Sequence, residues 1–535
     1  MTHLTRRHFL ETTAASATAF TILPRHVLGG PGHVAPSDQV TLASIGTGAQ
    51  GTRVMMDFLR QPNVRVVAVA DVNRESSDYS EWAPHEIRKK ERAITGDANW
   101  GSRWDGPTCG REPARRLVNA YYARHRPAVP GDSSHGCAAY NDFREMLARE
   151  HDLDAVAVCT PDHWHAPVAV TAMRAGKHVY GQKAMCHTFY EAKLMADVAR
   201  QTGAVTQVAV ADSASLATRQ LCEWIGAGVI GAVRRVENWS TRPYWPQGMD
   251  APTEAQPVPD GLDWDLWLGP APKRAFNHAY LPFIWRGWYD FGEGALGDMA
   301  NYSFDTIFRA LRLNSPIAVE ASSTQPHPQS FPTAALLWFQ FPERRDARTP
   351  DEVIAGVPFR PAGPGEGVAL PPVEIHYYTA QLTPQRPPQL EDGRELGAQG
   401  EGLLFIGDQG TIMCGFEGEH PQLIPAARMR AFTPPPATLP PSIGHYQEFL
   451  TAVLAAHAGQ TPVPPAANFA FEAPIAETIM LGNIATRKRQ RLIWDEASRD
   501  FTNPSAADCR ALLHPPYRAP WDRVMTDQGG AMSGA

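Results

Sequence analysis

The chain has 535 residues, which is enough for about three or four domain-sized units and a large buried core. Hydrophobic residues make up 43% of the chain and charged residues 20%, a balance that excludes a disordered or fibrous protein. The net charge of −7 provides no basic field to attract phosphates, so no nucleic-acid partner is expected. The 48 prolines, almost twice the average usage of roughly 5%, predict many rigid loops.

The seven cysteines are scattered and include no CxxC pair. This pattern argues against a disulfide framework and against a structural zinc ion, so no metal site is expected. Beyond the first 30 residues there is no run of 18 apolar residues, and therefore no membrane span is expected.

The N-terminus has the features of an export address. Arg6 and Arg7 are adjacent and precede a weakly apolar stretch of small residues over 12–23. This resembles a twin-arginine signal, which predicts the twin-arginine export machinery as a partner and a periplasmic or otherwise exported protein. We assign residues 1–37 to the signal and its linker. The alternative is a frayed basic terminus.

A dinucleotide-binding pattern follows. An apolar run over 40–45 predicts a buried strand, and the sequence GxGxxG over 46–51 comes directly after it. A helical pattern then leads to a second apolar run over 64–70, which ends at Asp71. A GxGxxG sequence alone is weak evidence, but the order strand, loop, helix, strand and acid is typical of dinucleotide binding.

Each part of this pattern has a physical role. Gly46 permits a tight turn, Gly48 lets a pyrophosphate approach the backbone, and Gly51 lets the helix pack closely on the strand. The helix N-terminus, including Ala49 and Gln50, presents N–H groups to phosphates. Asp71 can accept hydrogen bonds from ribose hydroxyls and would repel a 2′-phosphate, so NAD is expected rather than NADP.

Alternating strands and helices continue to residue 212, apart from an expected insertion over 76–137. The expected strands cover 154–159 and 178–180, and the expected helices cover 140–150, 167–175 and 189–201, with one further helical stretch over 113–124 inside the insertion. Such alternation predicts a Rossmann-type doubly wound parallel sheet over 38–212.

Ligands bind beyond the carboxyl ends of such strands. Thr160, Pro161, His163, His165 and Lys183 are therefore expected at the cofactor. For either histidine alone, a helix cap or loop polarity is the simpler interpretation. A zinc site is disfavoured because no third ligand is near in sequence.

These residues, with Lys183 among them, resemble the Gfo/Idh/MocA oxidoreductases, the family of glucose–fructose oxidoreductase and inositol dehydrogenase, and most closely their exported branch. The resemblance extends from residue 38 to about 521, apart from the insertion and the proline-rich stretch near 343–372. It is carried by the runs at 159–165, 221–224, 245–248, 257–270, 285–288, 294–299, 444–446 and 481–483. It implies an NAD-dependent enzyme that acts on a sugar or sugar derivative, and a homo-oligomer.

The chain departs from the family pattern at its substrate end. The family usually has Glu-Lys-Pro where this chain has Gln182-Lys183-Ala184, and histidine where this chain has Tyr302. The stretch 208–212 also lacks the usual glycine and amide residues. Glucose–fructose oxidoreductase itself has tyrosine at the matching helix position, so the change at Tyr302 is compatible with activity.

Three residues are expected to carry the catalysis. Asp298 and Tyr302 are four residues apart and share one helix face. A buried Lys183 beside Tyr302 would lower the pKa of the phenol, which could then take the proton of an alcohol as the hydride leaves. Asp298 would hold the lysine charged and oriented. The alternative is that Tyr302 is a packing residue in a degraded site.

The pattern changes after residue 212 to a predicted α+β domain over 213–500. Its strands, expected at 233–242, 317–322, 334–341, 373–379, 403–406 and 411–413, suit a mostly antiparallel open sheet. Helices over 445–456 and 469–484 are expected to return to the dinucleotide domain. A proline-rich tail over 501–535 follows, with Tyr517 and Trp521 as expected anchors.

Aromatic faces stack on sugar rings and arginine binds hydroxyls. The expected substrate contacts are Trp285, Arg286, Trp288, Asn301 and Asp305, whereas Trp264 and Trp267 are interpreted as core anchors. Two other functions remain open at this point: glycoside cleavage through transient oxidation and elimination, and a silent sugar-binding protein that keeps NAD as structure.

Overall fold

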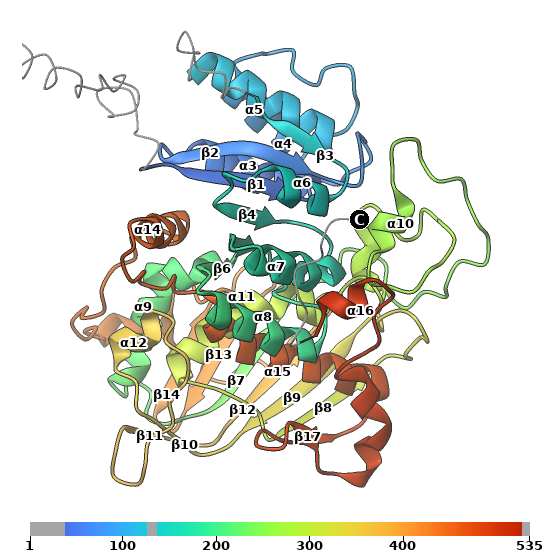
Figure 1. Cartoon of the computed structure of the whole chain (residues 1–535). Helices are drawn as coiled ribbons and strands as arrows, with labels where there is room; N and C mark the ends of the chain where they lie inside the picture. The colour runs from blue at the N-terminus through green and yellow to red at the C-terminus, as the bar shows by residue number, and fades with distance from the viewer. Residues whose placement is uncertain (1–37, 126–135, 527–535) are drawn as a thin grey trace, which may run out of the picture.

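The computed structural model describes residues 38–125 and 136–526. These residues form two regions, each built on one sheet, that meet along a shared layer of helices (Figure 1). Across the described ranges, every helix is too short or too polar to cross a bilayer. The twin-arginine motif lies outside the described residues.

The N-terminal region is a six-stranded parallel sheet with the strand order β3-β2-β1-β4-β5-β6. Its strands are β1 (Val40–Ile45), β2 (Val64–Ala70), β3 (Ala138–Tyr140), β4 (Ala155–Val158), β5 (His178–Gly181) and β6 (Thr206–Val208). The strands are apolar on both faces because helices cover both faces. This is the doubly wound sheet that the sequence predicts.

Two sets of helices bury this sheet. The helices α3 (Ala49–Leu59), α5 (Arg111–His125) and α14 (His445–His457) share one apolar cluster with it. The opposite cluster contains α6 (Phe143–Arg149), α7 (His165–Arg174) and α8 (Phe189–Thr202). The helix α14 comes from the far end of the sequence, and its Phe449 and Val453 are fully buried against the N-terminal sheet.

The expected insertion over 76–137 wrongly includes one helix of the parallel-sheet region. The helix α5 packs on β2 and β3 and connects them, so it is the ordinary crossover helix of the parallel sheet. The extra segment is therefore 76–110, which contains only α4 (Glu86–Thr95). The expected helix over 140–150 also begins later, at Phe143, because Asp142 caps it by accepting a hydrogen bond from the amide of Arg144.

The second region is a nine-stranded sheet with the order β15-β14-β13-β7-β12-β9-β8-β16-β17. Its strands are β7 (Val233–Trp239), β8 (Ala318–Ser323), β9 (Ala335–Phe341), β12 (Val373–Tyr378), β13 (Gly402–Gly407), β14 (Gly410–Cys414), β15 (Gln422–Ile424), β16 (Leu492–Asp495) and β17 (Asp500–Phe501). All neighbours are antiparallel except β7 and β12. A separate two-stranded sheet pairs β10 (Arg344–Asp346) with β11 (Val368–Leu370).

Two long helices cover the inner face of the nine-stranded sheet. They are α11 (Gly294–Leu311) and α15 (Phe469–Lys488), and α15 also packs on α8 of the N-terminal region. The remaining helices are α9 (Leu216–Gly226), α10 (Trp264–Leu268), α12 (Pro350–Ile354), α13 (Ala426–Ala431) and α16 (Trp521–Val524). The two regions therefore share one helical layer.

The C-terminal tail is docked on the N-terminal region. Trp521 in α16 is 2% exposed and packs edge-on against Trp164, with ring centroids 4.6 Å apart. It also stacks on Phe143 and lies under the guanidinium of Arg144. The expectation that Trp521 anchors the tail is confirmed.

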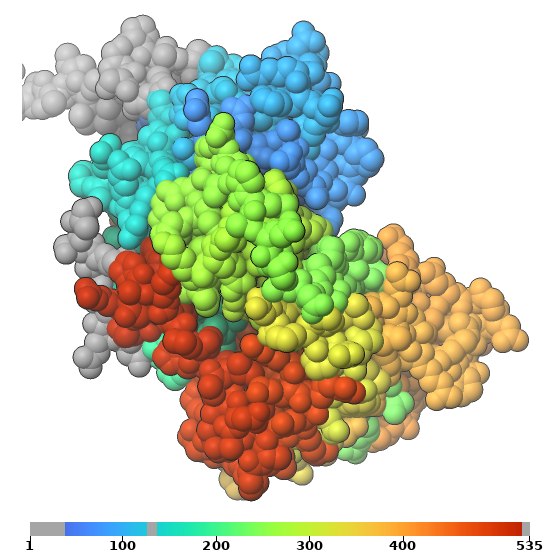
Figure 2. Space-filling view, turned by 90° about the vertical axis from the view of Figure 1, so that its right-hand side faces the viewer, coloured from blue at the N-terminus to red at the C-terminus, as the bar shows by residue number. Residues whose placement is uncertain are grey.

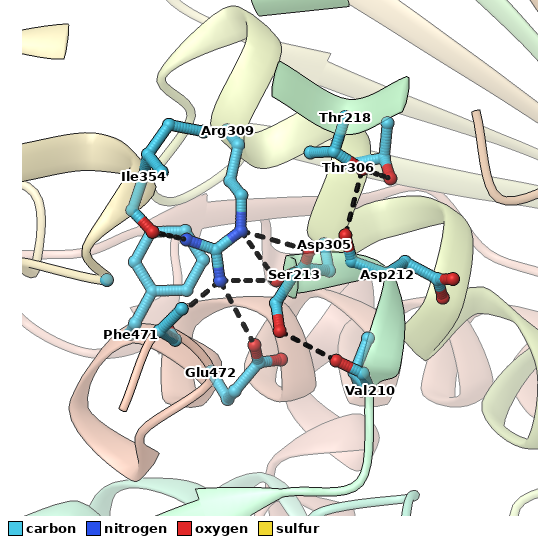
Figure 3. A network of polar contacts seen from close by, with 12 residues as sticks. Val210, Asp212, Ser213, Thr218, Asp305, Thr306, Arg309, Ile354, Phe471 and Glu472 are labelled. Carbon is cyan, nitrogen blue, oxygen red and sulfur yellow. Dashed lines mark hydrogen bonds and ion pairs between the residues drawn. The ribbon is translucent and has the colours of Figure 1, made fainter. Parts of the chain in front are cut away.

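The expectation that Asp305 contacts substrate is wrong. Its side chain is fully buried and pairs with Arg309 one turn further along α11, at 2.7 Å (Figure 3). Arg309 also donates to the carbonyl oxygens of Val353 and Ala466. Asp305 therefore neutralises a buried arginine that joins α11 to the end of α12 and to the loop before α15.

Replacing Trp521 with alanine should lower the free energy of unfolding by about 3–5 kcal/mol, because a large buried side chain leaves a cavity. Urea denaturation measures the change. Trp104→Ala is the matched control, since Trp104 is 36% exposed and should cost far less. Equal losses in the two variants would contradict the docking role of the tail.

Asp305→Ala should lower the free energy of unfolding by about 3–5 kcal/mol, since it leaves the buried Arg309 with the more distant Glu472, at 3.9 Å, as its carboxyl neighbour. Asp500→Ala removes an exposed ion pair with Arg510 and should cost less than about 1 kcal/mol. At a temperature where both variants are folded, ligand affinity should equal that of the unchanged protein. A selective loss of ligand affinity in Asp305→Ala would restore the substrate assignment.

Candidate active site

One large cavity of about 410 Å³ opens where the carboxyl ends of the parallel strands face α11. The long connection before α11, drawn in yellow-green, lies directly against the blue N-terminal region (Figure 2). Main-chain hydrogen bonds tie the two together, from the amide of Arg74 to Gly261 and from the amide of Asp263 to Val72. Both regions therefore build the walls.

The glycine-rich loop forms one end of the cavity with the expected geometry. Gly46 has a φ of +82°, and a Cβ on Gly51 would lie 1.9 Å from the carbonyl oxygen of Gly46. No other residue fits at either position. The helix α3 begins after Gly48 without a side-chain cap, so its first N–H groups have no side chain of their own to satisfy them. Gly48, Ala49, Gln50 and Gly51 all line the cavity.

Asp71 also lines the cavity, and it braces this loop. Its Oδ2 accepts hydrogen bonds from the amide of Thr47 at 2.6 Å and from the Thr47 hydroxyl at 3.2 Å, while Oδ1 accepts from the amide of Asn73. Burial raises the pKa of Asp71, and these hydrogen bonds oppose the shift. One carboxylate thus fixes the loop and keeps acceptor capacity for a ligand hydroxyl.

The three expected catalytic residues meet at the other end of the cavity. Nζ of Lys183, which follows β5, lies 2.7 Å from Oδ1 of Asp298 on α11 and 2.9 Å from its carbonyl oxygen. Nε of Arg286 lies 3.1 Å from the same carboxylate oxygen. Burial raises the pKa of Asp298, but Lys183 and Arg286 outweigh it and hold the pKa below its usual value. Lys183 and Asp298 are therefore both ionised. Together with Arg286 they form a group with a net positive charge.

Tyr302 lies one turn after Asp298, with Nζ of Lys183 5.4 Å from the centre of its ring. The expectation that the lysine lowers the pKa of this phenol below its usual value is wrong. Burial raises the pKa of Tyr302 by more than Lys183 lowers it, and nearby carboxyls raise it further. Tyr302 therefore remains a phenol at neutral pH, a proton donor rather than a ready base.

The two histidines expected at the cofactor lie behind the cavity wall. The ring nitrogens of His163 contact the carbonyl oxygens of Phe291 and Trp267, and those of His165 contact Ala184 and Thr160. Burial lowers the pKa of His163 to about 3 and that of His165 to about 4, so both are neutral. Both are structural, whereas Thr160 and Pro161 on the same turn do line the cavity.

Of the expected substrate contacts, Trp285 and Arg286 line the cavity. Trp288 is 1% exposed and donates its ring N–H to Ala279, inside a satellite apolar cluster. The amide of Asn301 is buried and donates to the carbonyl oxygen of Gly297 on its own helix. Trp288 and Asn301 therefore pack behind the cavity wall and do not line it. Asn301 is buried because α11 is covered on nearly every side.

The lining also includes residues that were not singled out from the sequence, and five of them have polar or aromatic side chains from distant parts of the chain. Tyr79 and Trp82 come from the extra segment 76–110, and Trp82 meets Phe283 across the cavity with ring centroids 5.8 Å apart. Asp162 begins the 3-10 helix Asp162–Trp164, and Arg242 and Glu417 come from two separate loops. Charged and aromatic residues are common in connecting segments, so the sequence does not indicate that these five side chains line one cavity. Only the tertiary structure brings them together.

The residues present fit a dinucleotide. The uncapped start of α3 suits a pyrophosphate, and Asp71 suits a ribose. The hydroxyl of Thr160 is buried in the lining without a hydrogen-bond partner among the described residues, so it is free for a ligand. No group of three or more potential metal ligands occurs within residues 38–125 and 136–526.

Comparison with known proteins gives two family matches. Residues 110–210 match the NAD-binding Rossmann fold of the GFO/IDH/MocA oxidoreductase family, and residues 220–343 match the C-terminal alpha/beta domain of the same family. The structure of the WlbA dehydrogenase from Bordetella pertussis, in complex with NADH and UDP-GlcNAcA, aligns with 14% identity and a TM-score of 0.48 over 85% of this chain and 99% of that one.

Three curated relatives match shorter stretches. A dTDP-3,4-didehydro-2,6-dideoxy-alpha-D-glucose 3-reductase of Streptomyces violaceoruber is 37% identical over 20% of this chain and 31% of its own length. Levoglucosan dehydrogenase of Pseudarthrobacter phenanthrenivorans is 26% identical over 27% of this chain and 37% of its own length. A glycosyl hydrolase family 109 protein of Shewanella is 26% identical over 38% of each chain.

The chain thus spans between 31% and 38% of the length of these relatives. The two family models match consecutive parts of the chain, and the structure has a parallel dinucleotide-type sheet followed by a mostly antiparallel one. In chain order, residues 110–210 and 220–343 are thus similar to the NAD-binding Rossmann domain and the C-terminal alpha/beta domain of the GFO/IDH/MocA oxidoreductase family.

Proposed function

We propose that the protein is an NAD-dependent oxidoreductase that transfers a hydride between a hydroxyl-bearing carbon of a sugar, or of a sugar derivative, and a nicotinamide cofactor. One observation carries the proposal: the charged group of Lys183, Asp298 and Arg286 shares a single cavity with the glycine loop and Asp71. Cofactor-binding and charge-stabilising residues thus face the same space.

Bound NAD would supply the hydride acceptor, and the chain's own residues supply charge and protons. Oxidation of an alcohol builds negative charge on its oxygen before the carbonyl forms. Lys183 and Arg286 together exceed the single charge of Asp298, so the site favours that oxygen anion. Tyr302, whose pKa burial raises, can donate a hydrogen bond to the same oxygen.

A sugar is the proposed substrate class. Trp285 presents an aromatic face in the lining, with the Arg286 guanidinium 4.2 Å from its ring centre. Arg242 lines the same part of the cavity and is paired with Glu401 at 2.9 Å, so its charge is balanced. Aromatic faces with balanced, hydrogen-bonding charges suit a polyhydroxyl ring. The names of two curated relatives, a sugar-nucleotide reductase and levoglucosan dehydrogenase, agree with this class.

We further propose that the cofactor is retained through many turnovers and that the net reaction is redox-neutral. The N-terminal motif Arg6-Arg7 supports export of a folded protein, and an exported enzyme has no soluble pool to recycle its cofactor. The contact of Trp82 with Phe283 across the cavity supports slow release. One substrate would be oxidised and a second, or the same molecule after rearrangement, reduced.

Glycoside cleavage through transient oxidation and elimination is the alternative, and the glycosyl hydrolase family 109 relatives fit it. Both functions use the same hydride chemistry, so the product separates them. A panel of free sugars, alditols and aryl glycosides, followed by chromatography, would give an oxidised sugar with a reduced partner for the main proposal. Release of the aryl group alone would favour cleavage.

Lys183→Met should lower kcat by at least about 100-fold while the cofactor remains bound, because the lysine acts at the reacting carbon end of the cavity. Asp298 keeps Arg286 as a partner in this variant, so the fold should persist. Lys177→Met is the control, since Lys177 bonds only to main-chain carbonyls of a surface turn. Unchanged turnover in Lys183→Met would remove the lysine from the mechanism.

The protein purified without added cofactor should carry dinucleotide and turn over without added NAD. Near-ultraviolet absorbance, with release of the cofactor by denaturation, measures the bound fraction. Trp82→Ala should increase the rate of cofactor loss on dialysis, because it removes the aromatic contact with Phe283. Protein that arrives empty and needs millimolar NAD would contradict retention of the cofactor.

A further inference from the structure

Two acidic side chains from distant parts of the chain meet beside Tyr302. Asp212 lies in the short 3-10 helix Ala211–Ala214 after β6, and Glu417 lies in the loop between β14 and β15. The Glu417 carboxyl is within hydrogen-bonding distance of the Asp212 side chain, and both raise the pKa of Tyr302. Nothing in the sequence relates the two positions.

A pair of threonine hydroxyls fixes this meeting. The hydroxyl of Thr306 on α11 donates to the carbonyl oxygen of Glu417 at 2.9 Å. The hydroxyl of Thr218 on α9 donates to the carbonyl oxygen of Asp212 at 3.0 Å, and the two hydroxyls are 3.2 Å apart (Figure 3). Thr306 follows Tyr302 by one helical turn, so the clamp holds both acids against the catalytic face of α11.

The two carboxyls need a proton between them. The side chain of Asp212 is 9% exposed, and its Oδ2 has no N–H or hydroxyl donor among the described residues. Two carboxylates at hydrogen-bonding distance in a buried place repel strongly, whereas one proton shared by the pair makes the contact favourable. Burial, with the neighbouring Glu417, raises the pKa of Asp212 well above its usual range.

The charges around the pair favour keeping this proton. Glu419 from the same loop, Glu401 from the start of β13 and Asp305 from α11 all face it and disfavour a second negative charge. Arg242, which follows β7, favours the charged form of Glu417. It is itself paired with Glu401 at 2.9 Å. Singly protonated, the pair carries one negative charge and one proton.

Only one member of the pair reaches the substrate space. Glu417 lines the cavity together with Tyr302, Arg242 and Lys183, whereas Asp212 is absent from the lining. We propose that Glu417 exchanges the substrate's hydroxyl proton and that Asp212 is the positioning residue that shares this proton. The proposal rests on the proposed oxidoreductase function.

Oxidation and reduction move the same proton in opposite directions. In oxidation the O–H bond of the alcohol breaks and its proton passes to Glu417, directly or through the Tyr302 hydroxyl, while the hydride on the carbon is transferred to the oxidised nicotinamide. The alcohol becomes a carbonyl, and the carboxyl pair becomes doubly protonated. In reduction the same proton returns to the carbonyl oxygen. A phenol that stays protonated cannot by itself accept the hydroxyl proton of the alcohol. Glu417 is the group that accepts this proton.

The first test uses activity. Glu417→Gln should lower kcat for alcohol oxidation by about 100-fold, because the amide cannot accept the proton. Asp212→Asn should shift the alkaline limit of carbonyl reduction to higher pH by about one unit, since the hydrogen bond from the protonated Asp212 lowers the pKa of Glu417 and an amide donates a weaker one. Glu472→Gln is the control, because Glu472 is a buried carboxyl in the neighbouring network around Arg309 that does not line the cavity (Figure 3). It should leave both the rate and the pH limit unchanged.

The second test needs no turnover, so it separates failure of this inference from failure of the proposed function. Infrared spectra of the substrate-free protein at pH 8 should contain the carbonyl band of a protonated acid that disappears in Asp212→Asn, while the carboxylate band stays unchanged because Glu417 remains ionised. Thr306→Val should weaken the same band, since it loosens the loop of Glu417 without removing either acid. Persistence of the band in Asp212→Asn, or an unchanged pH limit in that variant, would overturn the shared proton and the role of Glu417.

Discussion

The buried ion pair between Lys183 and Asp298 is the contact on which the active cavity depends. The lysine follows the fifth strand of the parallel sheet, and the aspartate lies in the first turns of α11 in the second region. A buried charge of either sign is costly unless its partner is held in place. The cavity therefore exists in its described form only where the two regions are docked, and the shared layer of α8, α11 and α15 provides that docking.

The same requirement explains why the surrounding acids differ in charge. Asp298 has two cationic partners, and its pKa is held low. Glu293 lies close by with neither carboxyl oxygen hydrogen-bonded among the described residues, and burial raises its pKa well above the usual value. Asp212 and Glu417 differ from both of these acids, because the two carboxyls share one proton. Protonated carboxyls beside the charged group of Lys183, Asp298 and Arg286 keep the net charge of the cavity small. They also hold protons close to the place where the proposed hydride transfer releases or consumes one.

The extra segment 76–110 changes the cavity without changing the fold. It leaves the parallel sheet at β2, and α5 returns to the sheet as an ordinary crossover helix. Between them, Tyr79 lies over Gly48, whose added Cβ would be 2.8 Å from the tyrosine ring, and Trp82 reaches Phe283 of the second region. A segment that adds nothing to the sheet thus covers the glycine loop and contacts both regions.

The sequence alone determined the parts of this protein that follow local rules. Strand–loop–helix spacing and the glycines at 46, 48 and 51 predicted the parallel sheet and the loop, because the tight turn at Gly46 and the close packing at Gly51 admit no other residue. The spacing of Asp298 and Tyr302 predicted a shared helix face, and Lys183 does meet Asp298. Tertiary structure decided the rest. Burial, which no local pattern encodes, made His163 and His165 structural, turned Asp305 toward Arg309 and raised the pKa of Tyr302. Glu417 and Asp212 are about two hundred residues apart in the chain, so only the packing of α9, α11 and the β14–β15 loop could bring two unremarkable acids close enough to share a proton.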